Sequence, residues 1–99
     1  MNTMSILREK IERKIRERLT AVYVEVIDES GKHAGHAGAA SGGGHFILKV
    51  VSDQFKGVSL LDRNRQVFDI LCEEMKGEIH ALAVKAMTPQ EWEASRAPS

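Results

Sequence analysis

The chain has 99 residues, of which 42% are hydrophobic, and this is enough for one domain with a single modest core. Lysine and arginine together number 14, as do aspartate and glutamate, so the overall charge favours neither nucleic acid nor an acidic partner. The one cysteine, Cys72, excludes an internal disulfide, and no apolar run has the length of a membrane span or a signal peptide. We therefore expect a soluble protein of a reducing compartment, either the cytoplasm or, in a eukaryote, the mitochondrion.

The first half of the chain predicts a helix followed by two strands. Apolar residues recur every four positions from about Ser5 to Leu19, which is typical of an amphipathic helix. The period changes to two from Ala21 to Ile27, with valines on one face, and this predicts a strand. The glycine-rich segment Asp28 to Gly44 is too long for a tight hairpin and is expected to be a mobile, functional loop. A second strand is predicted over His45 to Ser52.

A turn at Asp53 to Gly57 leads into a helical region from Ser59 to about Met75. One side of this region is apolar and comprises Leu60, Leu61, Val67, Phe68, Leu71 and Met75. Asn64 falls near the middle of that side, where a buried amide without a partner would be costly. Either the helix breaks around Asn64, or the amide caps another group.

The end of the chain predicts a third strand, Ile79 to Met87, and one short helix. Thr88, Pro89 and Glu91 form a strong helix start, with a capping threonine, proline at the first position and glutamate at the third. We expect residues 1–92 to form a single domain and residues 93–99 to be a disordered tail. The fold class is α+β, with helices packed on a three-stranded mixed sheet.

The topology brings histidines together that are far apart in sequence. The first two strands can pair antiparallel, whereas a helical crossover between the second and third favours parallel pairing. His33, His36, His45 and His80 are then expected at one end of the sheet. We interpret His45 as structural, because a strand start suits a hydrogen bond to the loop backbone.

Histidine and cysteine content predicts half of a metal site. A zinc or iron-sulfur site within one small chain normally draws four ligands from it, and this chain offers too few in suitable places. A partner would therefore complete the site. Taken alone, His80 at a strand start is more often a hydrogen-bonded structural residue, and histidines in a loop are most often solvated.

Several segments resemble the BolA family over nearly the whole stretch from Val24 to Trp92, namely VEVIDES, HFILKVVSDQFKG, LDRNRQVFDILCEEM and IHALAVKAMTPQEW. The resemblance implies an αββααβ fold related to the type II KH domain. It also implies a monothiol glutaredoxin as partner and a role in iron-sulfur cluster trafficking or iron regulation. Some members of the family are described as transcriptional regulators.

The resemblance also implies the ligands of a shared [2Fe-2S] cluster. His80 matches the family's histidine ligand at the head of the last strand, and His33 matches the loop ligand, with His36 as an alternative. A glutaredoxin cysteine and the thiol of a bound glutathione would supply the rest, so no cofactor is expected in the isolated chain. The chain departs from the family at Asn64, where the usual triplet is Arg-His-Arg, and its glycine-rich loop is longer than usual.

Two function classes follow. The first is a non-enzymatic adaptor that binds a monothiol glutaredoxin, because the sequence shows no nucleophile with a base, no paired catalytic carboxylates and no phosphate loop. The free protein would be a monomer or weak homodimer without membrane contact. The alternative is a DNA-binding regulator, with Arg13, Arg16, Arg63 and Arg65 as the contacts. A KH-type GxxG loop is absent and aromatic residues are few, which disfavours this alternative.

Overall fold

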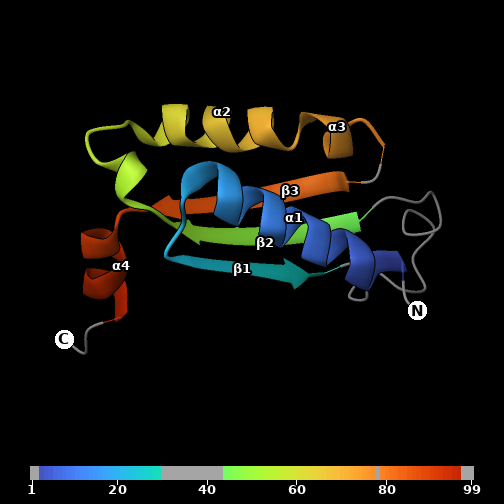
Figure 1. Ribbon diagram of the computed structural model, residues 1–99, viewed down its shortest axis with the longest axis horizontal. Helices are drawn as coiled ribbons and strands as arrows, with labels where there is room; N and C mark the ends of the chain where they lie inside the picture. The colour runs from blue at the N-terminus through green and yellow to red at the C-terminus, as the bar shows by residue number, and fades with distance from the viewer. Residues whose placement is uncertain (1–2, 30–43, 78, 97–99) are drawn as a thin grey trace.

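The computed structural model describes residues 3–29, 44–77 and 79–96. The helices and strands follow the order predicted from the sequence (Figure 1). They are α1 (Thr3–Leu19), β1 (Tyr23–Asp28), β2 (Gly44–Val51), the 3-10 turn η3 (Asp53–Phe55), α2 (Leu60–Ile70), α3 (Cys72–Met75), β3 (Ile79–Met87) and α4 (Pro89–Arg96). No helix within these ranges is both long and apolar enough to cross a membrane.

The three strands form one mixed sheet in the order β1-β2-β3. Strand β1 pairs antiparallel with β2, and β3 pairs parallel with β2, which confirms the predicted topology. In Figure 1, β1 ends and β2 and β3 begin at the right-hand end of the sheet, whereas α4 lies beyond its left-hand end. The expected α+β fold is therefore confirmed.

The core lies between one face of the sheet and helices α1, α2 and α3. Leu7, Ile11 and Ile15 of α1 are buried, as the four-residue spacing predicted. They pack in one cluster with inward-facing sheet residues such as Val24 and Leu48. The opposite sheet face carries half-buried and exposed residues, as expected for a sheet that helices cover on one side only.

Helix α2 corrects two expectations. It runs without a break through Asn64 and ends at Ile70, and α3 begins at Cys72 after the shared cap residue Leu71. Asn64 is only half-buried and lines an open hollow, so its amide needs no internal partner and the helix need not break. Leu60 and Leu61, predicted to be part of the apolar side, are 69% and 59% exposed. The buried apolar residues of the helix, Val67 and Ile70, belong to its later turns, so the apolar core does not reach the leucines of the first turn.

The ends of α2 and α4 carry the predicted caps. The Ser59 hydroxyl accepts a hydrogen bond from the Asp62 backbone N–H at 3.1 Å. At α4, Glu91 N–H donates to Thr88 Oγ1 at 3.2 Å and Thr88 N–H donates to Glu91 Oε1 at 2.8 Å, a reciprocal capping box. Helix α4 continues to Arg96, four residues past the predicted domain boundary at residue 92. Residues 97–99 of the predicted tail lie outside the described ranges.

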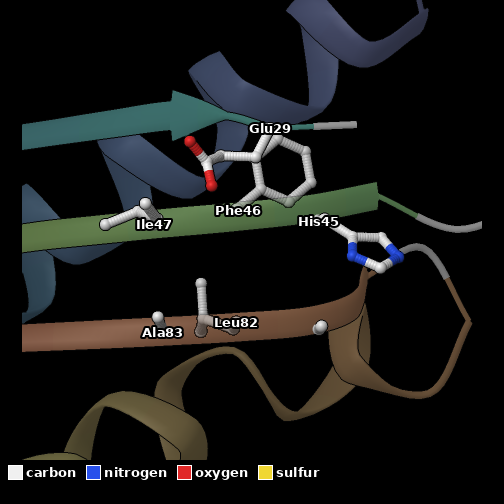
Figure 2. A pocket seen from close by; sticks show the side chains of 7 residues that line it. Glu29, His45, Phe46, Ile47, Leu82 and Ala83 are labelled. Atoms are coloured by element: carbon white, nitrogen blue, oxygen red, sulfur yellow. The ribbon is translucent and has the colours of Figure 1, made fainter. Parts of the chain in front are cut away.

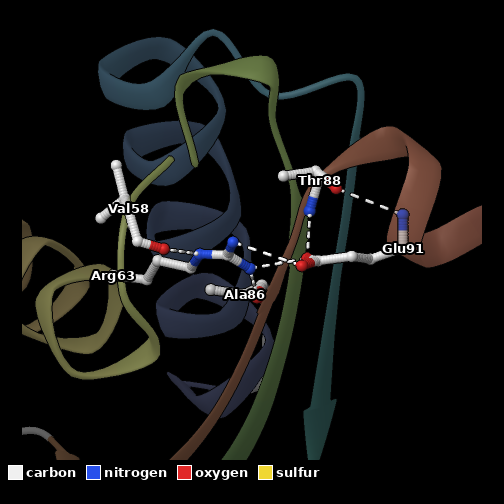
Figure 3. Close-up of polar contacts among 5 residues, drawn as sticks. All are labelled: Val58, Arg63, Ala86, Thr88 and Glu91. Carbon is white, nitrogen blue, oxygen red and sulfur yellow. Dashed lines mark hydrogen bonds and ion pairs between the residues drawn. The ribbon is translucent and has the colours of Figure 1, made fainter. Parts of the chain in front are cut away.

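Arg63 connects α2, β3 and α4 at the left-hand end of the sheet (Figure 3). Its Nε donates to the Val58 carbonyl at 2.8 Å, and its Nη1 donates to the Ala86 carbonyl at 3.1 Å. The same guanidinium forms an ion pair with Glu91, with Nη1 2.6 Å from Oε1. The hydrogen bonds from Arg63 and from the Thr88 backbone hold the pKa of the Glu91 carboxyl below its usual value. One buried side chain therefore fixes three segments.

Glu74 links helices α3 and α1, which lie on the same covered face of the sheet. Its side chain is 1% exposed, and both carboxylate oxygens lie 3.1 Å from Lys14 Nζ of α1. Lys10 Nζ lies 3.5 Å from Oε2. Burial by itself raises the pKa of this carboxyl, but its own backbone N–H and the two lysines outweigh that effect and hold the pKa below its usual value. The charged form thus ties α3 to α1.

Candidate metal-ligand site

The right-hand end of the sheet is where the predicted histidines were expected to meet. Gly44, the first residue of β2, lies opposite Ile79, the first residue of β3, and Asp28 at the end of β1 lies opposite Phe46. The segment between Asp28 and Gly44 therefore starts and finishes at this end. His33 and His36 belong to that segment and lie outside the described residues, so their positions stay predictions.

His80 occupies an irregularity in the pairing of β3 with β2. Gly44 pairs with Ile79 and His45 pairs with Ala81, so His80 is one extra residue on β3. Such a bulge re-aims side chains and breaks the strict alternation of faces. Ile79 is buried on the core side and Leu82 is half-buried, whereas His80 and Ala81 between them are both exposed. If β3 alternated regularly through this point, His80 would lie on the same face as Leu82.

His45 and His80 lie side by side. Their imidazole rings stack with centroids 5.1 Å apart and planes inclined by 30°. The prediction that both residues reach the same sheet end is confirmed. The structure also shows a ring contact that our structural interpretation of His45 did not include. Parallel pairing of the two strand starts was the available signal, but the bulge that turns His80 outward leaves no mark in the sequence.

A shallow hollow of about 320 Å³ adjoins His45 on the open face of the sheet (Figure 2). Its floor includes Ile47, Ala81 and Ala83, and the small alanine side chains leave the space open. In Figure 2 the Glu29 carboxylate points across the hollow, away from the His45 ring. The hollow thus presents an imidazole at one end, an apolar floor, and the Glu29 carboxylate across it.

The strand end beneath the hollow is tightly packed. A Cβ atom placed on Gly44 would lie 2.2 Å from Cε2 of Phe46, whose ring is buried. Glycine at this position therefore lets the Phe46 ring close over the backbone. This packing holds the start of β2, the strand that carries His45, against the core.

The donors at this end fit part of a metal site. Within residues 3–29, 44–77 and 79–96, no three His, Cys, Asp or Glu side chains gather closely enough to hold a metal ion. Cys72 is exposed on α3. Two adjacent imidazoles are good ligands for iron, zinc and copper, but they leave coordination positions for a partner to fill.

The residues of the nucleic-acid alternative are dispersed. Arg13 and Arg16 are exposed on α1, and Arg16 pairs with Glu12 at 2.9 Å. Arg65 is exposed and 3.4 Å from Asp62. Arg63 is a correction: its side chain is 7% exposed and its donors are used within the fold, so it cannot serve as a phosphate contact.

Comparisons with known proteins agree with this fold. A family model described as BolA-like protein matches residues 15–91. The chain is 42% identical over 88 residues to the Escherichia coli (strain K12) protein named DNA-binding transcriptional regulator BolA, which covers 89% of this chain and 81% of that protein.

Two further similarities involve Arabidopsis thaliana. The chain is 42% identical over 87 residues to SufE-like protein 1, chloroplastic/mitochondrial, covering 83% of this chain and 24% of that longer protein. The solved BolA domain of SufE1 is 39% identical with a TM-score of 0.74, covering 92% of this chain and 98% of that domain. The sheet, the helices that cover it and the sequence identity lead to one conclusion: the chain belongs to the family of BolA-like proteins.

Proposed function

We propose that this chain is a non-enzymatic adaptor that binds a monothiol glutaredoxin and shares or receives a [2Fe-2S] cluster. The observation that carries the proposal is the exposed His80 imidazole, which a strand bulge turns out of the sheet beside His45. A side chain held at a fixed strand end and open to solvent can reach a metal centre presented by another protein. This use would serve iron-sulfur trafficking or iron regulation.

His80 is the ligand that this chain contributes from the described residues. His33 is the second ligand, with His36 as the alternative, because their segment begins and ends at the same sheet end. The glutaredoxin cysteine and the thiol of its bound glutathione complete the set. Two histidines on one iron raise the reduction potential relative to ligation by thiolates alone. A site divided between two chains also suits transfer, since it disassembles when the chains separate.

The hollow beside His45 supports the approach of a partner. It is apolar along Ile47, Ala81 and Ala83, and it opens directly next to the two imidazoles. An apolar side chain of glutaredoxin placed there would exclude water from the neighbouring metal site. This contact would orient the partner while His80 supplies the metal bond.

The test compares His80→Ala with the wild-type chain in an anaerobic complex with a monothiol glutaredoxin, glutathione and the reconstituted cluster. We expect His80→Ala to keep its fold and to shift the visible absorption and circular dichroism of the complex toward those of glutaredoxin alone. His33→Ala should produce a similar change, and His36→Ala serves as the matched control within the same segment. An unchanged spectrum with His80→Ala contradicts the proposal. A spectral change with His36→Ala but not with His33→Ala would identify His36 as the loop ligand.

A second candidate function is DNA binding, which the name of the Escherichia coli relative favours. The contacts would be the exposed Arg13, Arg16 and Arg65, without Arg63. Binding of this kind should be selective at moderate salt, fall when Arg13 or Arg16 is neutralised, and be unaffected by His80→Ala. Electrophoretic mobility shifts with the same variants therefore separate the two functions.

A further inference from the structure

We propose that His45 and His80 together form a site for a single divalent transition-metal ion of the zinc and cobalt class on the free protein. The site requires neither glutaredoxin nor an iron-sulfur cluster, so it does not depend on the function proposed above. It gives His45 a role as a ligand, in addition to its place in the strand.

The spacing of the two rings is the first argument. When two imidazoles bind one zinc ion with Zn–N bonds of about 2.1 Å and a tetrahedral angle, their ring centroids lie about 5 Å apart. The centroids of His45 and His80 are 5.1 Å apart. Because the rings are stacked and their nitrogen lone pairs lie in the ring planes, both side chains must rotate until the rings face the ion edge-on, and the centroid distance then places one nitrogen of each ring within reach of a common ion.

The backbone beneath the rings is the second argument. His45 is paired in the sheet with Ala81, and His80 is the unpaired bulge residue directly before Ala81, so the two histidines lie on neighbouring strands and are flanked by paired residues. A site mounted on strands loses less conformational entropy on binding than one on a mobile loop. Of the two side chains, His80 is exposed and His45 half-buried, so solvent and metal ions reach them.

The residues around His45 and His80 determine how many ligands the protein gives to the ion. Within the described ranges no third His, Cys, Asp or Glu side chain joins the pair closely enough to hold a metal ion. Water would fill the remaining positions in the free protein, as in open zinc sites. Because the same His80 would also be the cluster ligand, a bound ion would have to leave, or lose His80, when the glutaredoxin complex forms.

The experiment titrates the purified full chain with Co²⁺ and with Zn²⁺, in the absence of glutaredoxin. Co²⁺ absorption gives the dissociation constant, and long-range ¹H–¹⁵N NMR with Zn²⁺ identifies which ring nitrogens respond. We expect both His45 and His80 to shift. His45→Phe keeps a ring against His80 but removes the nitrogens, and it should weaken binding at least about tenfold, as should His80→Phe.

The double variant His33→Ala/His36→Ala is the control, in which zinc should still shift both His45 and His80. Circular dichroism checks the fold of each variant, and His45→Gln replaces His45→Phe if the latter does not fold. Wild-type affinity in the folded His45 variant overturns the proposal, as does a wild-type chain whose two imidazoles do not respond to millimolar Zn²⁺. Failure of the glutaredoxin proposal would leave this result unaffected, because the titration contains neither glutaredoxin nor cluster.

Discussion

The two ends of the sheet use their polar side chains in opposite ways. At the left-hand end, Arg63, Thr88 and Glu91 bond to one another and to backbone carbonyls, and Ser52 donates to the Leu19 carbonyl at 2.7 Å. At the right-hand end, His80 is exposed beside an open hollow.

This difference suggests that the polar side chains of the left-hand end stabilise the fold, whereas those of the right-hand end are available for the proposed binding. Within the described residues, no buried side-chain nitrogen or oxygen lacks a hydrogen-bond partner, so removing a donor from the left-hand end orphans a buried acceptor. Removing the exposed His80 imidazole at the right-hand end leaves no buried acceptor without a partner. Exposed side chains at the right-hand end, such as His80, can therefore be replaced without leaving a buried polar group unpaired.

The largest expected effect comes from breaking the left-hand end. Arg63→Ala leaves the Val58 and Ala86 carbonyls without the guanidinium and should lower the free energy of unfolding by about 3 kcal/mol. The matched change at the other end, His80→Ala, should cost less than about 0.5 kcal/mol. Urea denaturation of both variants checks this. Equal losses of unfolding free energy in the two variants would show that the left-hand end is no more important for stability than the right-hand end.

A smaller effect should come from overfilling the strand start at the right-hand end. Gly44→Ala places a methyl group against the buried Phe46 ring and should lower the free energy of unfolding by about 2 kcal/mol. Gly77→Ala is the control, because a Cβ there meets nothing within 4 Å. Thermal melts of the two variants measure the difference. Indistinguishable melts would mean that this strand end is looser than its packing indicates.

Features that depend on residues close together in the sequence could be predicted, whereas features that depend on distant contacts could not. The Ser59 and Thr88 caps were predictable because each depends on residues three positions apart. The exposure of Leu60 was not, because it depends on how far the core extends along α2. The orientation of His80 was missed for a similar reason: the bulge is a property of two paired strands, and β3 alone shows only alternation.

The smallest expected effect concerns Glu74 of α3. Glu74→Gln removes the carboxylate that Lys14 and Lys10 contact and should lower the free energy of unfolding by about 1 kcal/mol at neutral pH. The folded-state pKa of Glu74 lies below the usual 4.5, so the unfolded chain binds its proton first as the pH falls. The stabilisation is therefore complete above the usual value and is lost as the pH falls through the lower, folded value.

Urea denaturation of wild type and Glu74→Gln at neutral and acidic pH measures this effect. Other carboxylates titrate in the same range, but they are common to both proteins, so the difference between the two isolates Glu74. The gap in unfolding free energy should narrow as the pH falls below 4.5. A gap that stays constant, or widens in acid, would show that the Glu74 charge does not stabilise the fold.

The extra residue at His80 also sets where β3 tolerates insertions and deletions. From the pair His45 and Ala81 to the pair Val51 and Met87, the register with β2 is unbroken. Deleting one residue of that stretch, for example Ala83, would move every later side chain to the other face and direct Lys85 at the core. Deleting one at the bulge would only restore regular pairing. The strand can therefore be shortened by one residue at the histidine without exchanging its inner and outer faces.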